Sequence, residues 1–261
     1  MASGRFFRQL RILVLLLVLF VVAMDAWLMK VRSTDWDEPL WVVVYPVNGD
    51  GSDVTARYID SLHPGVFAPI AEFLDREAGR KGLSQQDLVK MKLGPEVDSR
   101  PPAPPHDRGI PGVMWWSLRL RYWAWQIGRE YSGPPADIRL FVVYHDPAMH
   151  VRLDHSLGLQ KGLIGVVNAF ASPSMSSRNN VVIAHEILHT LGATDKYDPA
   201  TNQPLFPAGY AEPARTPLHP QVNAEIMGGR IPVTASTAEI PPGLGRVVVG
   251  EATALEINWV E

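Results

Sequence analysis

Two histidines and a glutamate lie close together in one stretch of the chain, His185-Glu186-Ile187-Leu188-His189. On a helix, side chains four residues apart lie one above the other on the same face, so His185 and His189 can bind one metal ion together. Glu186 is next to the first histidine and can reach a water molecule at the metal without displacing it. The spacing therefore predicts a metal-dependent hydrolase in which Glu186 is the general base.

A third metal ligand is expected shortly after this helix. Gly192 lets the chain turn sharply, and Asp195 follows three residues later, where its carboxylate can return to the metal. Three protein ligands leave one position open for water, which is the pattern of a catalytic site. Three other downstream side chains remain alternatives for the third ligand: Asp198, Glu212 and His219.

The stretch HEILHTLGATD at residues 185–195 resembles the HExxHxxGxxH/D signature of the metzincin clan of zinc metallopeptidases. The aspartate in the last position resembles the variant of snapalysin-like members. The resemblance implies one catalytic Zn²⁺ ion held by His185, His189 and Asp195, in a zinc-dependent endopeptidase that acts on a peptide or protein substrate. It also implies a tight turn with a methionine under the zinc, for which Met227 is the counterpart.

By the same resemblance, an extended peptide substrate would pair with an edge strand of the sheet at residues 162–170. An ordinary buried strand is the alternative interpretation of this segment. The residues expected along the substrate are Gly165, Val166, Val167 and Asn168.

The methionine turn is not followed by the tyrosine that some subfamilies of the clan have. The group that stabilises the transition state is therefore unassigned, with three alternatives: Tyr197, Tyr210 and Arg230. Two other functions also remain open. A non-catalytic zinc-containing binding module would keep the fold but would not need Glu186, whereas a zinc hydrolase of a non-peptide amide would share the same water-activating chemistry.

The elements that must position these residues mix strands and helices. We expect an α+β fold that is metzincin-like: a mixed twisted sheet, an active-site helix, and a mostly irregular C-terminal subdomain that ends in a helix. Runs of apolar and β-branched residues predict strands, and a 3.6-residue apolar period predicts helices. The predicted strands are 40–47, 91–93, 138–144 and 162–170, and the predicted helices are 66–82, 84–90, 112–129, 179–191 and 249–259.

The composition is that of a globular protein, with 46% hydrophobic and 20% charged residues. A net charge of −3 carries no sign of the basic surface typical of nucleic-acid binding, so no nucleic-acid partner is expected. The sequence has no cysteine, which excludes disulfides, cysteine metal ligands and a thiol nucleophile.

Residues 1–33 are predicted to be an N-terminal membrane anchor or signal segment, because residues 12–24 form an uncharged apolar run after three arginines. Residues 34–261 would form the metallopeptidase catalytic domain, in which 95–135 look like an insertion. The expected protein crosses the membrane once through its N-terminal helix. Its N-terminus would be cytoplasmic and its catalytic domain periplasmic or extracellular; it would be secreted if the segment is cleaved.

Three further histidines, His145, His150 and His155, follow the strand predicted at 138–144. Their spacing matches no ligand pattern, so we interpret them as loop histidines, with a second metal site as the alternative. Asp50 lies in the sequence Asn-Gly-Asp-Gly and is interpreted as a turn residue.

Overall fold

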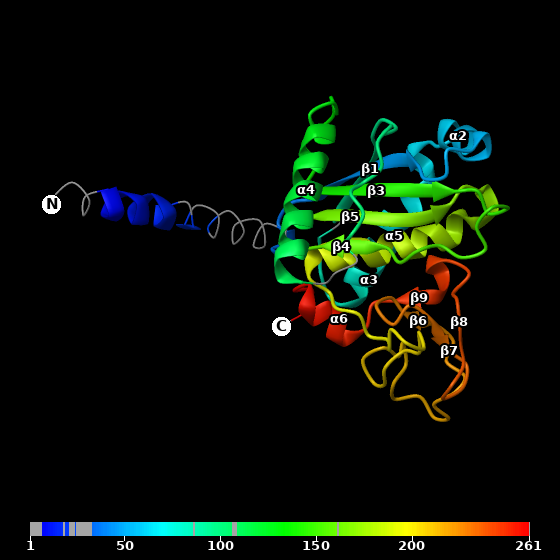
Figure 1. The fold of residues 1–261 in the computed structure, drawn as a ribbon. Helices are drawn as coiled ribbons and strands as arrows, with labels where there is room; N and C mark the ends of the chain where they lie inside the picture. The colour runs from blue at the N-terminus through cyan, green and yellow to red at the C-terminus, as the bar shows by residue number, and fades with distance from the viewer. Residues whose placement is uncertain are drawn as a thin grey trace.

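The chain folds into a five-stranded sheet with helices on both faces, as the computed structural model shows (Figure 1). The structure describes residues 7–17, 19–20, 24, 33–85, 87–105, 109–160 and 162–260. The strands of the sheet are β1 (Leu40–Asn48), β2 (Val89–Leu93), β3 (Ile138–His145), β4 (Leu157–Leu159) and β5 (Ile164–Phe170). The helices are α2 (Asp53–Asp60), α3 (Ala68–Arg80), α4 (Ile110–Gly128), α5 (Ser176–Leu191) and α6 (Glu251–Glu256), with short 3₁₀ turns η1 (Pro64–Val66), η2 (Pro173–Met175) and η3 (Leu244–Arg246).

The strand order is β2-β1-β3-β5-β4. The first four strands are parallel to one another, and β4 runs antiparallel to β5. Parallel strands are buried on both faces, which is why β1 and β3 are nearly continuous apolar runs. The fold is therefore mixed α/β with a mostly parallel sheet, which is compatible with the α+β class expected from the sequence.

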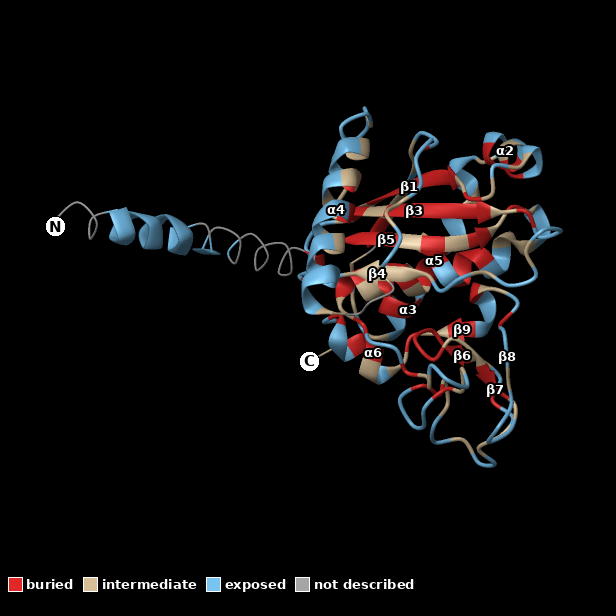
Figure 2. Cartoon of the chain, viewed as in Figure 1, coloured by how far each residue is buried: buried red, intermediate tan, exposed pale blue. Residues whose placement is uncertain are grey.

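Two hydrophobic cores lie on opposite faces of the sheet. Val42 of β1 packs in the core that includes α3 and α5, whereas its neighbour Val43 packs in the core that includes Leu120 of α4. Successive side chains of a strand point to opposite faces, so one strand contributes side chains to both cores. Figure 2 shows the central strands buried and much of the outer surface of α4 exposed. Helix α4, which lies in the segment 95–135 expected to be an insertion, thus supplies one layer of the fold.

Helix α5 confirms the helix predicted at 179–191 and begins three residues earlier, at Ser176. Ile183 and Ile187 are fully buried and hold the helix against the sheet. The helix ends at Gly192, whose φ of 110° is in the left-handed region that glycine adopts at low cost. This turn directs the following residues back towards the histidine face of α5.

One local prediction is wrong, and one helix was missed. The helix predicted at 84–90 is absent from the described part of that segment, because Val89 instead pairs with Leu40 of β1 at the start of β2. Tertiary pairing here outweighs local helix propensity. Conversely, α2 was not expected, although Ser52 caps it by accepting a hydrogen bond from the Thr55 N–H.

The expectation that residues 162–170 form the edge of the sheet is also wrong. Strand β4 pairs with β5, with Leu157 opposite Val166 and Leu159 opposite Ile164, and β4 itself stands at the edge. Its three residues are too few to give a recognisable period, which is why the sequence did not reveal it.

The chain after α5 is mostly irregular, as expected, and ends in α6, which is shorter than the predicted helix 249–259. The indole N–H of Trp36 donates to the Ile257 carbonyl at 2.8 Å, so the beginning and the end of this domain are joined. The short strands of this part are β6 (Ala224–Glu225), β7 (Ile231–Pro232), β8 (Ala238–Glu239) and β9 (Val247–Val248).

The prediction of a single-pass membrane protein is wrong. Within the described residues, no helix is long and apolar enough to cross a membrane. Residues 7–17 of the predicted anchor are helical. Other parts of the predicted anchor, including residues 25–32, lie outside the described residues.

Candidate metal centre and its cleft

The imidazole rings of His185 and His189 lie next to each other on α5, with ring centroids 4.6 Å apart. A backbone carbonyl orients each ring: Nδ1–H of His185 donates to the Ile226 oxygen at 2.9 Å, and Nδ1–H of His189 donates to the Ala193 oxygen at 2.8 Å. These bonds leave the lone pair of each Nε2 for a metal, which is how zinc-bound histidines are usually held.

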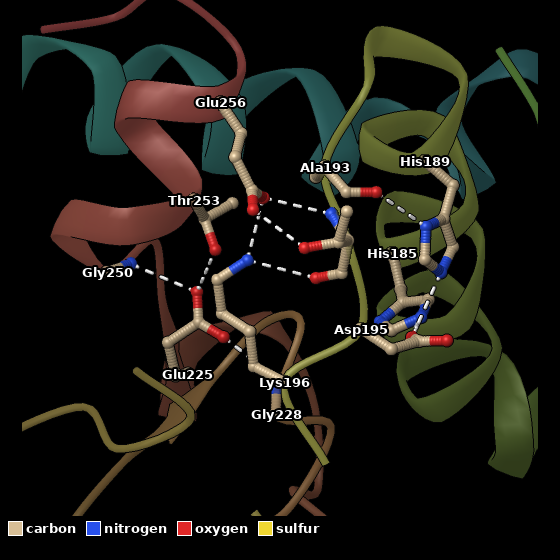
Figure 3. Close-up of polar contacts among 11 residues, drawn as sticks. His185, His189, Ala193, Asp195, Lys196, Glu225, Gly228, Gly250, Thr253 and Glu256 are labelled. Carbon is tan, nitrogen blue, oxygen red and sulfur yellow. Dashed lines mark hydrogen bonds and ion pairs between the residues drawn. The ribbon is translucent and has the colours of Figure 1, made fainter. Parts of the chain in front are cut away.

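Asp195 completes the group (Figure 3). Its Oδ1 lies 3.2 Å from Nε2 of His185 and 3.1 Å from Nε2 of His189. Although partial burial alone would raise the pKa of Asp195, the two imidazoles hold it well below its ordinary value. Two imidazole nitrogens and one carboxylate oxygen that converge in this way fit the ligand set of a Zn²⁺ ion.

The structure places the three alternative third ligands elsewhere. The carboxylate of Asp198 accepts hydrogen bonds within its own turn, from Ala200 and Thr201. The remaining two have other partners, since Glu212 pairs with Arg215 and His219 contacts the Tyr210 hydroxyl.

Glu186 faces a cleft of about 350 Å³ that His185 also lines. The side chain is only 4% exposed, and its Oε2 has no hydrogen-bond partner among the described residues. Burial raises the pKa of Glu186, while the neighbouring histidines lower it less. A buried carboxylate oxygen without a partner is costly, and a water or substrate proton at this position would satisfy it.

Of the four residues expected along the substrate, the structure brings Asn168 to the cleft. Gly165 and Val167 are instead buried in the sheet, and Val166 packs against the α4 core. The strand that approaches the site is β4: a Cβ on Gly158 would lie 2.5 Å from Cβ of His189 and 2.7 Å from the backbone oxygen of Glu186. Only glycine permits this close approach.

The three candidates for transition-state stabilisation are now separated. Tyr197 and Arg230 line the cleft with Glu186. Tyr210 does not line it and contacts His219 instead. The first two are therefore placed to meet a substrate carbonyl in this cleft.

Met227 lies in the predicted tight turn, in which Gly228 N–H donates to the Glu225 carbonyl at 3.0 Å. Its side chain is fully buried in the core that includes α5. The turn supports the site through its backbone, because the carbonyl of Ile226 orients His185 and that of Met227 accepts from Lys196 N–H at 2.9 Å.

A group of polar residues that the sequence did not reveal holds the segment around Asp195 (Figure 3). Glu256 of α6 accepts from Thr194 N–H at 2.9 Å and from Lys196 Nζ at 2.7 Å, so it fixes the residues on both sides of Asp195. Glu225, fully buried, accepts from Gly228, Gly250 and Thr253 and joins the methionine turn to α6. These partners are far apart in the sequence and carry no local motif.

No protein-family model matches the chain, and no curated protein is significantly similar to it. A functional assignment therefore depends on the geometry of this site.

Proposed function

We propose that the chain is a zinc-dependent endopeptidase of metzincin type. The observation that carries the proposal is the convergence of Nε2 of His185, Nε2 of His189 and Oδ1 of Asp195 close to the buried carboxylate of Glu186, which lines a cleft. A non-catalytic zinc site has no need of such a base, so the position of Glu186 favours an enzyme over a binding module.

In the proposed reaction, His185, His189 and Asp195 hold the metal, and Glu186 moves the proton. Bound zinc would act as a Lewis acid that polarises the scissile carbonyl and makes water more acidic. The Glu186 carboxylate takes a proton from the attacking water and delivers it to the leaving amine. Tyr197, at the cleft, can donate a hydrogen bond to the carbonyl oxygen as negative charge develops on it.

The edge of the sheet supports a peptide rather than a non-peptide amide as the substrate. Strand β4 stands at this edge, and Gly158 brings it against Glu186 and His189. An extended peptide that pairs with β4 would run past the proposed general base, since main-chain pairing at a sheet edge is a common mode of peptide binding.

The test uses the purified full chain, loaded with Zn²⁺ and incubated with a mixed peptide library, with products identified by mass spectrometry. We expect the wild type and Glu130→Ala, a variant of an exposed glutamate in the turn after α4, to cut the same bonds. Glu186→Ala should bind zinc and cut nothing. A zinc-loaded wild type that cuts no peptide would contradict the proposal.

A further inference from the structure

A second group of metal-ligating side chains lies apart from the one on α5. One ligand atom from each of Asp50, His145 and His150 lies within 4.8 Å of the others. Asp50 follows the end of β1, and His145 is the last residue of β3. Because β1 and β3 are parallel neighbours, their C-terminal ends meet at the same edge of the sheet.

The ring of His145 is oriented as a ligand. Its Nε2 lies 3.2 Å from Oδ1 of Asn168, whose amide nitrogen donates to the carbonyls of Asp154 and His155. The amide orientation therefore makes Oδ1 the acceptor and Nε2–H the donor, which leaves the lone pair on Nδ1 of His145. This Nδ1 is buried and has no hydrogen-bond partner among the described residues.

The backbone beside this ring is shaped to admit it. A Cβ on Gly49 would lie 2.6 Å from Cε1 of His145, so glycine is required for the imidazole to lie this close to the loop. Burial lowers the pKa of His145, so the neutral ring with a free lone pair is favoured.

Asp50 is held as an ionised carboxylate. Its Oδ2 accepts from Asp146 N–H and the Thr55 hydroxyl, and its Oδ1 accepts from Ser52 N–H. Partial burial would raise the pKa of Asp50, but these donors lower it to about 2. Carboxylates that ligate metals are oriented by hydrogen bonds in the same way.

His150 closes the group from the solvent side. Its ring centroid lies 5.0 Å from that of His145, and its backbone N–H donates to the Asp146 carbonyl in a short turn. The side chain is partly exposed, which leaves an ion a path from solvent.

We propose that Asp50, His145 and His150 form a second metal site, which takes Zn²⁺. Two imidazoles and a carboxylate are ligands that suit this ion. This site is connected to the cleft through Asn168, which both orients His145 and lines the cleft. A metal here would join the ends of β1 and β3 and fix the loop of residues 146–156, whose last residues line the same cleft. The proposal does not depend on peptidase activity.

The test counts bound metal. The full chain is stripped with a chelator and dialysed against Zn²⁺, and the bound zinc is measured by mass spectrometry. We expect two ions per chain in the wild type and in His63→Ala, a control at an exposed histidine outside both groups. One ion is expected in His150→Ala, one in His189→Ala, and none in the double variant. A single ion in the wild type, or two in His150→Ala, would overturn the proposal.

A second readout separates loss of the site from loss of folding. In the His189→Ala background, added zinc should slow trypsin cleavage after Arg152 several-fold, because only the second site remains to fix that loop. Asp50→Asn, which keeps the shape of the side chain, should remove this protection while the circular dichroism spectrum is unchanged. Equal protection in His189→Ala with and without the Asp50→Asn change would contradict the proposed ligand set.

Discussion

At the scale of residues, the main-chain carbonyls decide what the two helix histidines can do. Ile226 and Ala193 take the Nδ1 protons of His185 and His189, so both Nε2 atoms are available at one point. The spacing of the histidines is local and could be read from the sequence. The carbonyl partner of His185 comes from a turn 41 residues away and could not.

Replacing Tyr197 with phenylalanine tests which side chain stabilises the transition state. We expect kcat to fall on the order of 10²-fold, because one donor to the developing oxyanion is lost. Because Tyr197 also hydrogen-bonds the Asp195 carboxylate, kcat is compared at equal zinc content. Tyr210→Phe is the matched control, since Tyr210 does not line the cleft. Equal kcat values for the two variants, measured on one peptide, would exclude the role of Tyr197.

Glu256→Gln tests the charge that holds the segment around Asp195. Burial would raise the pKa of Glu256, but hydrogen bonds from Lys196 and Thr194 bring it below its ordinary value of 4.5. As the pH falls, Glu256 is therefore protonated at a higher pH in the unfolded chain than in the folded chain. The stabilisation is fully present above the unfolded pKa and is lost as the pH falls through the lower, folded pKa.

Urea unfolding of the zinc-free protein measures this effect. Between about pH 5 and pH 3, the midpoint should fall more for the wild type than for Glu256→Gln. Glu239→Gln, a change at an exposed residue of β8, should follow the wild type. If the urea midpoints of wild type and Glu256→Gln fall equally over this pH range, the charge of Glu256 does not stabilise the fold.

At the scale of elements, the period of apolar residues is enough to predict a helix or strand that is long and packs against the core. The helix 179–191 and the strands 40–47 and 138–144 were predictable for this reason. The three-residue strand β4 was not, and its absence from the prediction placed the edge of the sheet one strand too early. The substrate residues expected on β5 were therefore mostly misplaced, with Asn168 as the exception.

Gly158→Ala tests the contact of β4 with α5. The added methyl group would lie against Cβ of His189 and the backbone of Glu186, so we expect a loss of about 1–3 kcal/mol in the free energy of unfolding. Gly79→Ala on α3 meets no atom within 4 Å and should add about 0.5–1 kcal/mol. Urea denaturation gives the free energy of unfolding of both variants. If Gly158→Ala is as stable as the wild type, the close contact of β4 with α5 is refuted.

At the scale of the whole molecule, the candidate centre joins parts that are distant in the sequence. The histidines come from α5, the segment of Asp195 is held by α6, and His185 is oriented by the methionine turn. This assembly was not visible in the sequence, because buried pairs such as Glu225 with Thr253 have no pattern of their own. The sequence did predict the three side chains that converge, His185, His189 and Asp195, and the irregular C-terminal part that carries Asp195.

Metal removal tests this joining role. In His150→Ala, which keeps only the centre on α5, free zinc about 100-fold above the dissociation constant should raise the Tm of the metal-free chain by about 5–10 °C, since one bound ion adds about 2.7 kcal/mol to the folded state. Mg²⁺, which prefers oxygen ligands, should leave the Tm unchanged. Differential scanning calorimetry provides the measurement, and equal effects of the two ions would argue against a nitrogen-rich site.

The most direct test of the proposed activity compares kcat/KM of wild type and Glu186→Gln on one cleaved peptide, with zinc content measured in the same samples. Glu186 lines the cleft and is not among the converging ligand atoms. We therefore expect equal zinc content, with kcat/KM of the variant lower by a factor on the order of 10²–10⁴, the usual contribution of a general base. Equal kcat/KM at equal zinc content would contradict the proposed role of Glu186.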